Sequence, residues 1–309
     1  MTVSSDQPVE AQTWLVLGMH RSGTSLLTHA LSRLGGYVGP ENRLLAPTGD
    51  NPEGFFELTD MVDINGELLA RGQGDWVIPP RVQNWESARF NGCRARAQKF
   101  IARDFKGHPR WLFKDPRLCL TLGFWTPLLP NPKTMMCLRR PSAVCRSLNQ
   151  RNGLAPAYSR WLWAIYVASA LEYAETSLRG FVFYEDFLQD PVSSLMPWVG
   201  NPGDTDVVRS KMEAALAGIV KPGLNHADPP KSDPVDSAYE DLRNGPKDVT
   251  SLWENTMHLA TRILADGRPY LNKEGRILAK VLLELKSLRT QRDALERQIR
   301  EGTNGIKSR

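Results

Sequence analysis

WLVLGMHRSGTSLLTHALSRLG, residues 14–35, has the pattern of a strand, a tight loop and a helix. The apolar run at residues 15–17 is long enough for a buried strand and too short for a helix. From Thr24 onward apolar residues recur at helical spacing, and Gly35-Gly36 is typical of a helix end. The loop between them, residues 18–23, would aim backbone N–H groups and the positive end of the helix at one point. The segment therefore predicts a phosphate-binding cradle.

This loop has almost the spacing of a nucleotide-triphosphate P-loop, G-x-x-x-x-G-K-[ST], with Gly18 and Gly23 at the glycine positions. Thr24 stands where that motif has lysine, and Ser25 follows it. The cation lies inside the loop instead, at Arg21, and an arginine fork suits an oxyanion without the help of a metal. An ordinary strand–turn–helix with an incidental arginine is the plainer alternative, because glycine-containing loops are common.

Composition is that of a soluble globular protein. The 309 residues are 41% hydrophobic and 24% charged, with a net charge of +5. From residue 276 onward nine Lys or Arg oppose four Asp or Glu, and this difference equals the whole excess, so we expect no nucleic-acid partner. Four cysteines without C-x-x-C pairing predict reduced core thiols. Residues 1–13 have no signal-peptide pattern and residues 161–174 are too short to span a bilayer, so a cytoplasmic protein is expected.

Two further strand candidates, residues 111–114 and 134–138, are short apolar runs that end in charged loops. Alternation of strands and helices is typical of a parallel α/β sheet, in which ligands bind beyond the carboxyl ends of the strands. Arg21, Lys114 and Arg139 all fall at such ends. We therefore expect three cations from distant parts of the chain to converge on one crevice.

The expected domain organisation is one large domain followed by a helical tail. We predict a disordered N-terminus over residues 1–13, the domain over 14–272, a C-terminal helix over 273–300 and a disordered tail over 301–309. Heptad spacing in the helix favours a short coiled coil and a homodimer, and a single helix packed on the body fits as well. Its basic residues would also suit a membrane surface or an acidic partner. The Pro- and Gly-rich residues 222–246 predict an irregular connection or mobile flap.

Three segments together resemble the sulfotransferases that use 3′-phosphoadenosine 5′-phosphosulfate (PAPS). GMHRSGTS, residues 18–25, is similar to that family's 5′-phosphosulfate loop. Arg139, with Ser147 eight residues later, resembles its 3′-phosphate site, and YEDF at residues 184–187 is similar to the segment after the next core strand. The bacterial branch, with its glycan-modifying members, looks most similar, because NPEGFFE at residues 51–57 also matches a pattern found there.

The resemblance covers about residues 14–191 and implies the P-loop NTPase-like sulfotransferase fold, a three-layer α/β sandwich with a central parallel sheet. It implies sulfuryl transfer from PAPS to a hydroxyl or amine without a metal, with a carbohydrate or glycolipid as the expected acceptor. Lys114 would lie against the leaving oxygen. The residues that would hold PAPS are His20, Arg21, Ser22, Gly23, Thr24, Ser25, Arg139 and Ser147. Tryptophans that would stack on a sugar, or simply pack, are Trp76, Trp85 and Trp125.

Three carboxylates compete for the role of general base. The cytosolic sulfotransferases have a histidine two residues beyond the lysine, where this chain has Pro116. Other branches look as if they use a glutamate from the loop after the first helix, where Glu41 and Glu57 lie. We favour Glu57, because Phe55-Phe56 before it would exclude water and raise its pKa. Glu41 is the second candidate and Asp115 the third, although Asp before Pro more often structures a turn.

Two other functions remain compatible with the sequence. A P-loop nucleotide kinase or NTPase would need a lysine before Ser25 and a strand-end Asp for Mg²⁺, and only Asp115 is present for the latter. A non-catalytic nucleotide-binding scaffold, making its partner contact through the terminal heptads, would retain the cradle and lack transfer. The histidines show no H-x-x-x-H spacing, so no metal site is expected.

Overall fold

The computed structural model describes residues 11–49, 51–80, 82, 84–174, 176–199, 205–220 and 234–244. Its sheet has the strand order β2-β1-β3-β4, and every neighbouring pair is parallel. The strands are β1 (Gln12–Leu17), β2 (Arg110–Lys114), β3 (Pro132–Leu138) and β4 (Leu178–Phe183). The predicted parallel α/β sheet is therefore confirmed, with the carboxyl ends of all four strands at one edge.

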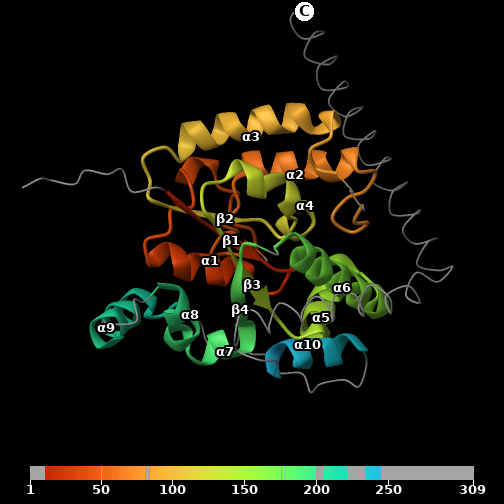
Figure 1. Cartoon of the computed structure of the whole chain (residues 1–309). Coiled ribbons are helices and arrows are strands. Elements are labelled where there is room, and N and C mark those ends of the chain that lie inside the picture. Colours follow the sequence, from red (N-terminus) through yellow and green to blue (C-terminus); the bar gives the residue numbers. More distant parts are fainter. Residues whose placement is uncertain are drawn as a thin grey trace, which may run out of the picture. The chain divides into compact units, whose positions relative to one another are not determined.

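Helices cover both faces of this sheet (Figure 1). Apolar side chains of one face pack with α1, α7, α8 and α9 around Val16, Met135 and Val182. On the other face Phe113 of β2 contacts Phe100 of α3, with ring centroids 6.3 Å apart. The helices are α1 (Thr24–Arg33), α2 (Thr59–Arg71), α3 (Asn91–Asp104), α4 (Leu118–Trp125), α5 (Pro141–Asn152), α6 (Pro156–Tyr173), α7 (Tyr184–Gln189), α8 (Pro191–Val199), α9 (Thr205–Leu216) and α10 (Pro234–Asn244). The architecture is a three-layer α/β sandwich.

The expectation of an irregular connection over residues 222–246 is wrong where α10 lies. Val235, Ala238, Tyr239 and Leu242 recur at i, i+3, i+4 and i+7, and all four are buried. The helix packs against α5 and α6. Proline and glycine on either side of this short periodic segment obscured its pattern in the sequence.

Other expectations can be checked only in part. All four cysteines are buried free thiols, as predicted. Within the described ranges, no helix combines the length and the apolar character needed to cross a membrane. The helix predicted over residues 273–300, its coiled coil, the tail at 301–309 and most of the N-terminus at 1–13 lie outside the described residues.

Candidate active site

The loop between β1 and α1 has a backbone that suits anion binding. Gly23 precedes α1 with a φ of 89°, and none of the described side chains caps this helix. Arg21 also adopts a positive φ, 70°, which is uncommon for a residue with a side chain. The first N–H groups of α1 therefore remain available at the positive end of the helix, as an oxyanion site requires. The structure places the predicted cradle at the carboxyl end of β1.

Gly23→Ala is expected to destabilise the protein by about 1–3 kcal/mol, because a Cβ would occupy a left-handed backbone and meet Tyr184. The added Cβ would lie 2.1 Å from the Tyr184 ring. Gly66→Ala is the matched control, since no atom lies within 4 Å of its added Cβ inside α2. This control should stabilise the protein by about 0.5–1 kcal/mol. Urea unfolding measures both, and equal effects would contradict the close packing at Gly23.

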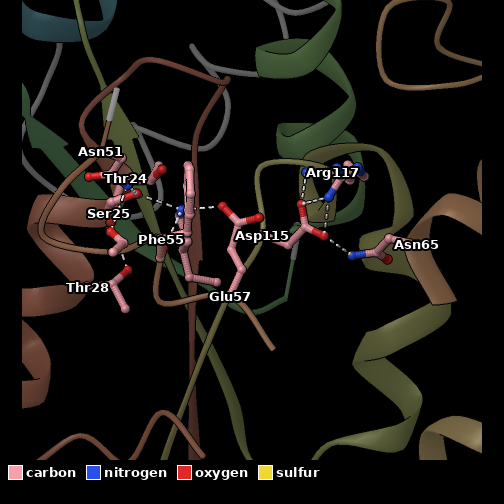
Figure 2. Close-up of polar contacts among 11 residues, drawn as sticks. Thr24, Ser25, Thr28, Asn51, Phe55, Glu57, Asn65, Asp115 and Arg117 are labelled. Carbon is pink, nitrogen blue, oxygen red and sulfur yellow. Dashed lines mark hydrogen bonds and ion pairs between the residues drawn. The ribbon is translucent and has the colours of Figure 1, made fainter. Parts of the chain in front are cut away.

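Lys114, the last residue of β2, joins segments of the site that contribute Ser25, Phe55 and Glu57, which are labelled in Figure 2. Its Nζ donates to Ser25 Oγ at 2.9 Å, to the Phe55 carbonyl at 2.9 Å and to Glu57 Oε1 at 2.6 Å. These three bonds use the full donor capacity of an ammonium group. Lys114 is 2% and Glu57 6% exposed, so the ion pair is almost completely buried. The lysine thus connects the start of α1 with the loop that precedes α2.

Of the three candidate bases, only Glu57 lines the cavity at this site. Burial raises the pKa of Glu57 and the charge of Asp115 adds to the increase, while Lys114 opposes it. Glu41 is exposed, in the short 3-10 helix Glu41–Arg43. The role of Glu57 as the base stays a prediction, and the structure gives it the most suitable surroundings.

Asp115 belongs to a buried polar network instead. Its Oδ1 and Oδ2 accept from Arg117 Nη1 at 3.0 and 2.9 Å, and Oδ2 also accepts from Asn65 Nδ2 at 2.9 Å. Asn65 Oδ1 in turn accepts from Thr121 Oγ1 and Trp125 Nε1, both at 2.8 Å. Asp115 is completely buried, so these partners are what makes its charge tolerable. The network holds the Arg117 side chain at the cavity.

Arg139 and Ser147, which are predicted to bind a 3′-phosphate, lie against the loop of residues 18–25, here called the phosphate loop. Arg21 Nε donates to Ser147 Oγ at 2.8 Å, and Arg139 Nη1 donates to the Arg21 carbonyl at 3.0 Å. The Arg139 guanidinium also lies 4.6 Å from the centroid of the Tyr184 ring. Residues more than a hundred positions apart thereby form one wall of the site.

These side chains line a cavity of about 550 Å³. The cations of its lining are Arg21, Lys114, Arg117, Arg139, Arg146 and Arg151, and its carboxylates are Glu53 and Glu57. With the histidines counted as neutral, the described lining therefore carries a formal charge of +4. The convergence of three cations expected from the sequence is present, and three more join it. Arg151 could have been found from its place on α5 one turn after Ser147, and Arg146 directly precedes Ser147 in the chain.

Ser22 and His20, two residues of the phosphate loop, are more buried than the sequence indicated. Ser22 is buried and does not line the cavity, and its N–H donates to the Met19 carbonyl. His20 does line it and packs on Trp76, with ring centroids 4.6 Å apart. Burial lowers the pKa of His20 well below its usual range, and nearby cations, Arg117 first among them, add to the decrease. His20 is therefore a neutral imidazole.

The tryptophans divide between the core and the site. Trp125 is fully buried and Trp85 is 6% exposed, so neither is available to stack on a sugar. Of the two alternatives for these tryptophans, packing is the one observed, because Trp85 contacts Phe90 and Trp125 contacts Phe100. Trp76 is half-buried against His20.

Comparisons with known proteins give no family. No family model matches the chain, and no curated protein matches it. Among solved structures, the sulfotransferase domain of the Synechococcus PCC 7002 olefin synthase is 18% identical, with a TM-score of 0.40. The alignment covers 85% of this chain and 98% of that one. A sulfotransferase domain from the curacin biosynthetic pathway is 14% identical over 82% of this chain and 97% of that chain, with a TM-score of 0.38.

Structural similarity with such low identities and TM-scores does not assign the chain to a family. The class of protein therefore has to be inferred from the structure of this chain itself. The parallel sheet and the cationic cavity at the carboxyl ends of its strands define an α/β protein with a candidate site whose charge suits an anionic ligand. Within the described segments, no group of three His, Cys, Asp or Glu side chains could hold a metal ion.

Proposed function

We propose that this protein is a sulfotransferase that moves the sulfuryl group of PAPS to a hydroxyl or amine. One observation carries the proposal: the phosphate loop, Lys114 and the Arg139–Ser147 pair line a single cavity of formal charge +4. PAPS is a polyanion with two separate anionic ends, a 5′-phosphosulfate and a 3′-phosphate. A carbohydrate or glycolipid acceptor is part of the proposal and rests on the sequence resemblance alone.

The residues present fit this donor. The uncapped start of α1 and Arg21 offer N–H groups for the 5′-phosphosulfate. Arg139 and Ser147 would bind the 3′-phosphate, a group that ATP lacks. When bound, the donor supplies the activated sulfuryl group, and the chain supplies charge stabilisation, orientation and a proton acceptor.

Lys114 and Glu57 would perform these last tasks as a pair. Lys114 would stabilise negative charge on the leaving oxygen, and Glu57 would take the proton of the acceptor. Their 2.6 Å contact favours the ionised carboxylate and so opposes the effect of burial, which raises the pKa of Glu57. Burial by Phe55 and Phe56 would exclude water from the same place.

A Mg²⁺-dependent kinase or NTPase is not favoured. Thr24 replaces the P-loop lysine, and both oxygens of Asp115 already accept hydrogen bonds from Arg117 or Asn65. A non-catalytic nucleotide-binding scaffold has no observation in its favour, and a transfer assay separates it from the enzyme.

The direct test is calorimetric titration with PAP, the spent donor, and separately with ATP and Mg²⁺. We expect PAP to bind without metal and Arg139→Ala to weaken it roughly 10- to 100-fold, as for the loss of charge-assisted hydrogen bonds. Arg140→Ala is the matched control, because this neighbour does not line the cavity and pairs with Glu240. Preferential binding of ATP with Mg²⁺ would overturn the proposal in favour of the kinase.

A further inference from the structure

The cavity has a second end, beyond Glu57, that the donor does not occupy if the proposed function holds. Ser25, at the start of α1, and Arg117 lie on opposite sides of Glu57 (Figure 2). In-line transfer requires the acceptor and the leaving group on opposite sides of the reacting sulfur. With the phosphosulfate at the start of α1, the acceptor therefore belongs on the side of Glu57 where Arg117 lies.

The Arg117 side chain is held by Asp115 and still has N–H groups that can donate hydrogen bonds to a ligand. Its two bonds to Asp115 both come from Nη1, and Asn65 holds Asp115 from the other side. Its Nε and Nη2 make no hydrogen bond to the described residues, while its side chain is 19% exposed and lines the cavity. A guanidinium held on one edge and open on another is preorganised for a planar or tetrahedral oxyanion.

A second guanidinium, that of Arg151, lines the same cavity. Arg151 comes from the last turn of α5, one turn after Ser147, and adds to the positive charge that an acidic group would meet. The carboxylates of the described lining are Glu53 and Glu57, and Lys114 pairs with Glu57.

We propose that the acceptor carries an acidic group, a carboxylate or a sulfate, beside its reacting hydroxyl or amine, and that Arg117 binds that group while Arg151 adds positive charge to the same cavity. The inference deepens the proposed function and depends on it. Arg117 would bind the acidic group while the acceptor nucleophile lies at Glu57. Such a site selects against neutral acceptors, because a matched neutral group leaves the guanidinium donors unpaired.

The test is titration of the PAP-saturated protein with three matched sugars: methyl glucoside, methyl glucuronoside and methyl glucoside 6-sulfate. We expect at least one acidic sugar to bind about tenfold or more tightly than the neutral sugar, as a charge-assisted hydrogen bond predicts. The carboxylate and sulfate arms distinguish the two acidic groups. Arg117→Lys should remove most of this preference, because lysine keeps a charge for Asp115 and loses the fork.

Controls separate this inference from the fold and from the proposed function. Arg110→Lys, at the exposed opposite end of β2, should keep the preference. Arg151→Gln, which leaves the Asp115 network intact, should weaken acidic sugars several-fold and is informative even if the Arg117 variant does not fold. Absence of acid preference, or a preference that survives both cavity variants, overturns the inference while PAP binding stands. Failure of PAP to bind the unaltered protein overturns the proposed function and this inference together.

Discussion

Replacing Lys114 by methionine is expected to lower transfer on the order of 10²–10³-fold and to destabilise the protein by roughly 3–5 kcal/mol. The rate falls because the positive charge assigned to the leaving oxygen is removed. The stability falls because Glu57 loses its ion-pair partner while it remains 6% exposed. Ser25 and Phe55 lose a hydrogen-bond donor at the same time.

A double variant separates two contributions to the loss of stability, that of the broken ion pair and that of the lost packing. In Lys114→Met with Glu57→Gln no buried charge is left unpaired, so the loss of stability should be clearly smaller than the sum of the two single losses. Urea unfolding of all four proteins gives this coupling. Lys133→Met is the control for a lysine at the opposite end of a strand, and it should change stability by less than about 1 kcal/mol. Additive losses would mean that the pair contributes nothing.

Glu57→Gln is expected to reduce kcat roughly 10²–10⁴-fold and to leave PAP affinity unchanged. Glutamine keeps the shape and a hydrogen bond to Lys114 but does not accept a proton. PAP affinity, measured by titration, should hold because the donor is assigned to Arg21, Arg139 and Ser147. Unimpaired transfer in Glu57→Gln would remove Glu57 as the base. Glu41→Gln, which changes an exposed side chain outside the cavity, should be close to the unaltered protein in both measurements.

Because Glu57 titrates, we expect the stability of the protein and the rate of transfer to change in opposite directions with pH. Burial raises the pKa of Glu57, so the folded protein binds more protons than the unfolded chain between about pH 4.3 and the raised value. Stability contributed by this group is present below that window and is lost as the pH rises through the raised pKa. The rate rises across the same window, because only the ionised carboxylate accepts a proton. Both trends should disappear in Glu57→Gln, as unfolding and kcat profiles over pH 4–8 would show.

Local spacing was enough to predict the framework of the site. The strand–loop–helix around Gly18 and Gly23 depends on neighbours within a few residues, and glycine adopts the left-handed backbone at Gly23 without a steric cost. The ends of β2 and β3 followed from short apolar runs, which placed Lys114 and Arg139 at the correct edge of a parallel sheet. The pattern for α10 was too short, between proline-rich segments, to predict a helix.

Patterns along the chain were enough to predict the fold class, the loop before α1 and the edge of the sheet at which cations gather, because periodicity and turn residues act over short separations. Long-range packing, in contrast, brings Glu57 and not Glu41 to the cavity, pairs Lys114 with Glu57 and places Asp115 where it orients Arg117. The Lys114–Glu57 and Asp115–Asn65 contacts join residues 57 and 50 positions apart. Contacts over such separations depend on how whole helices and strands pack, and no local spacing in the chain encodes them.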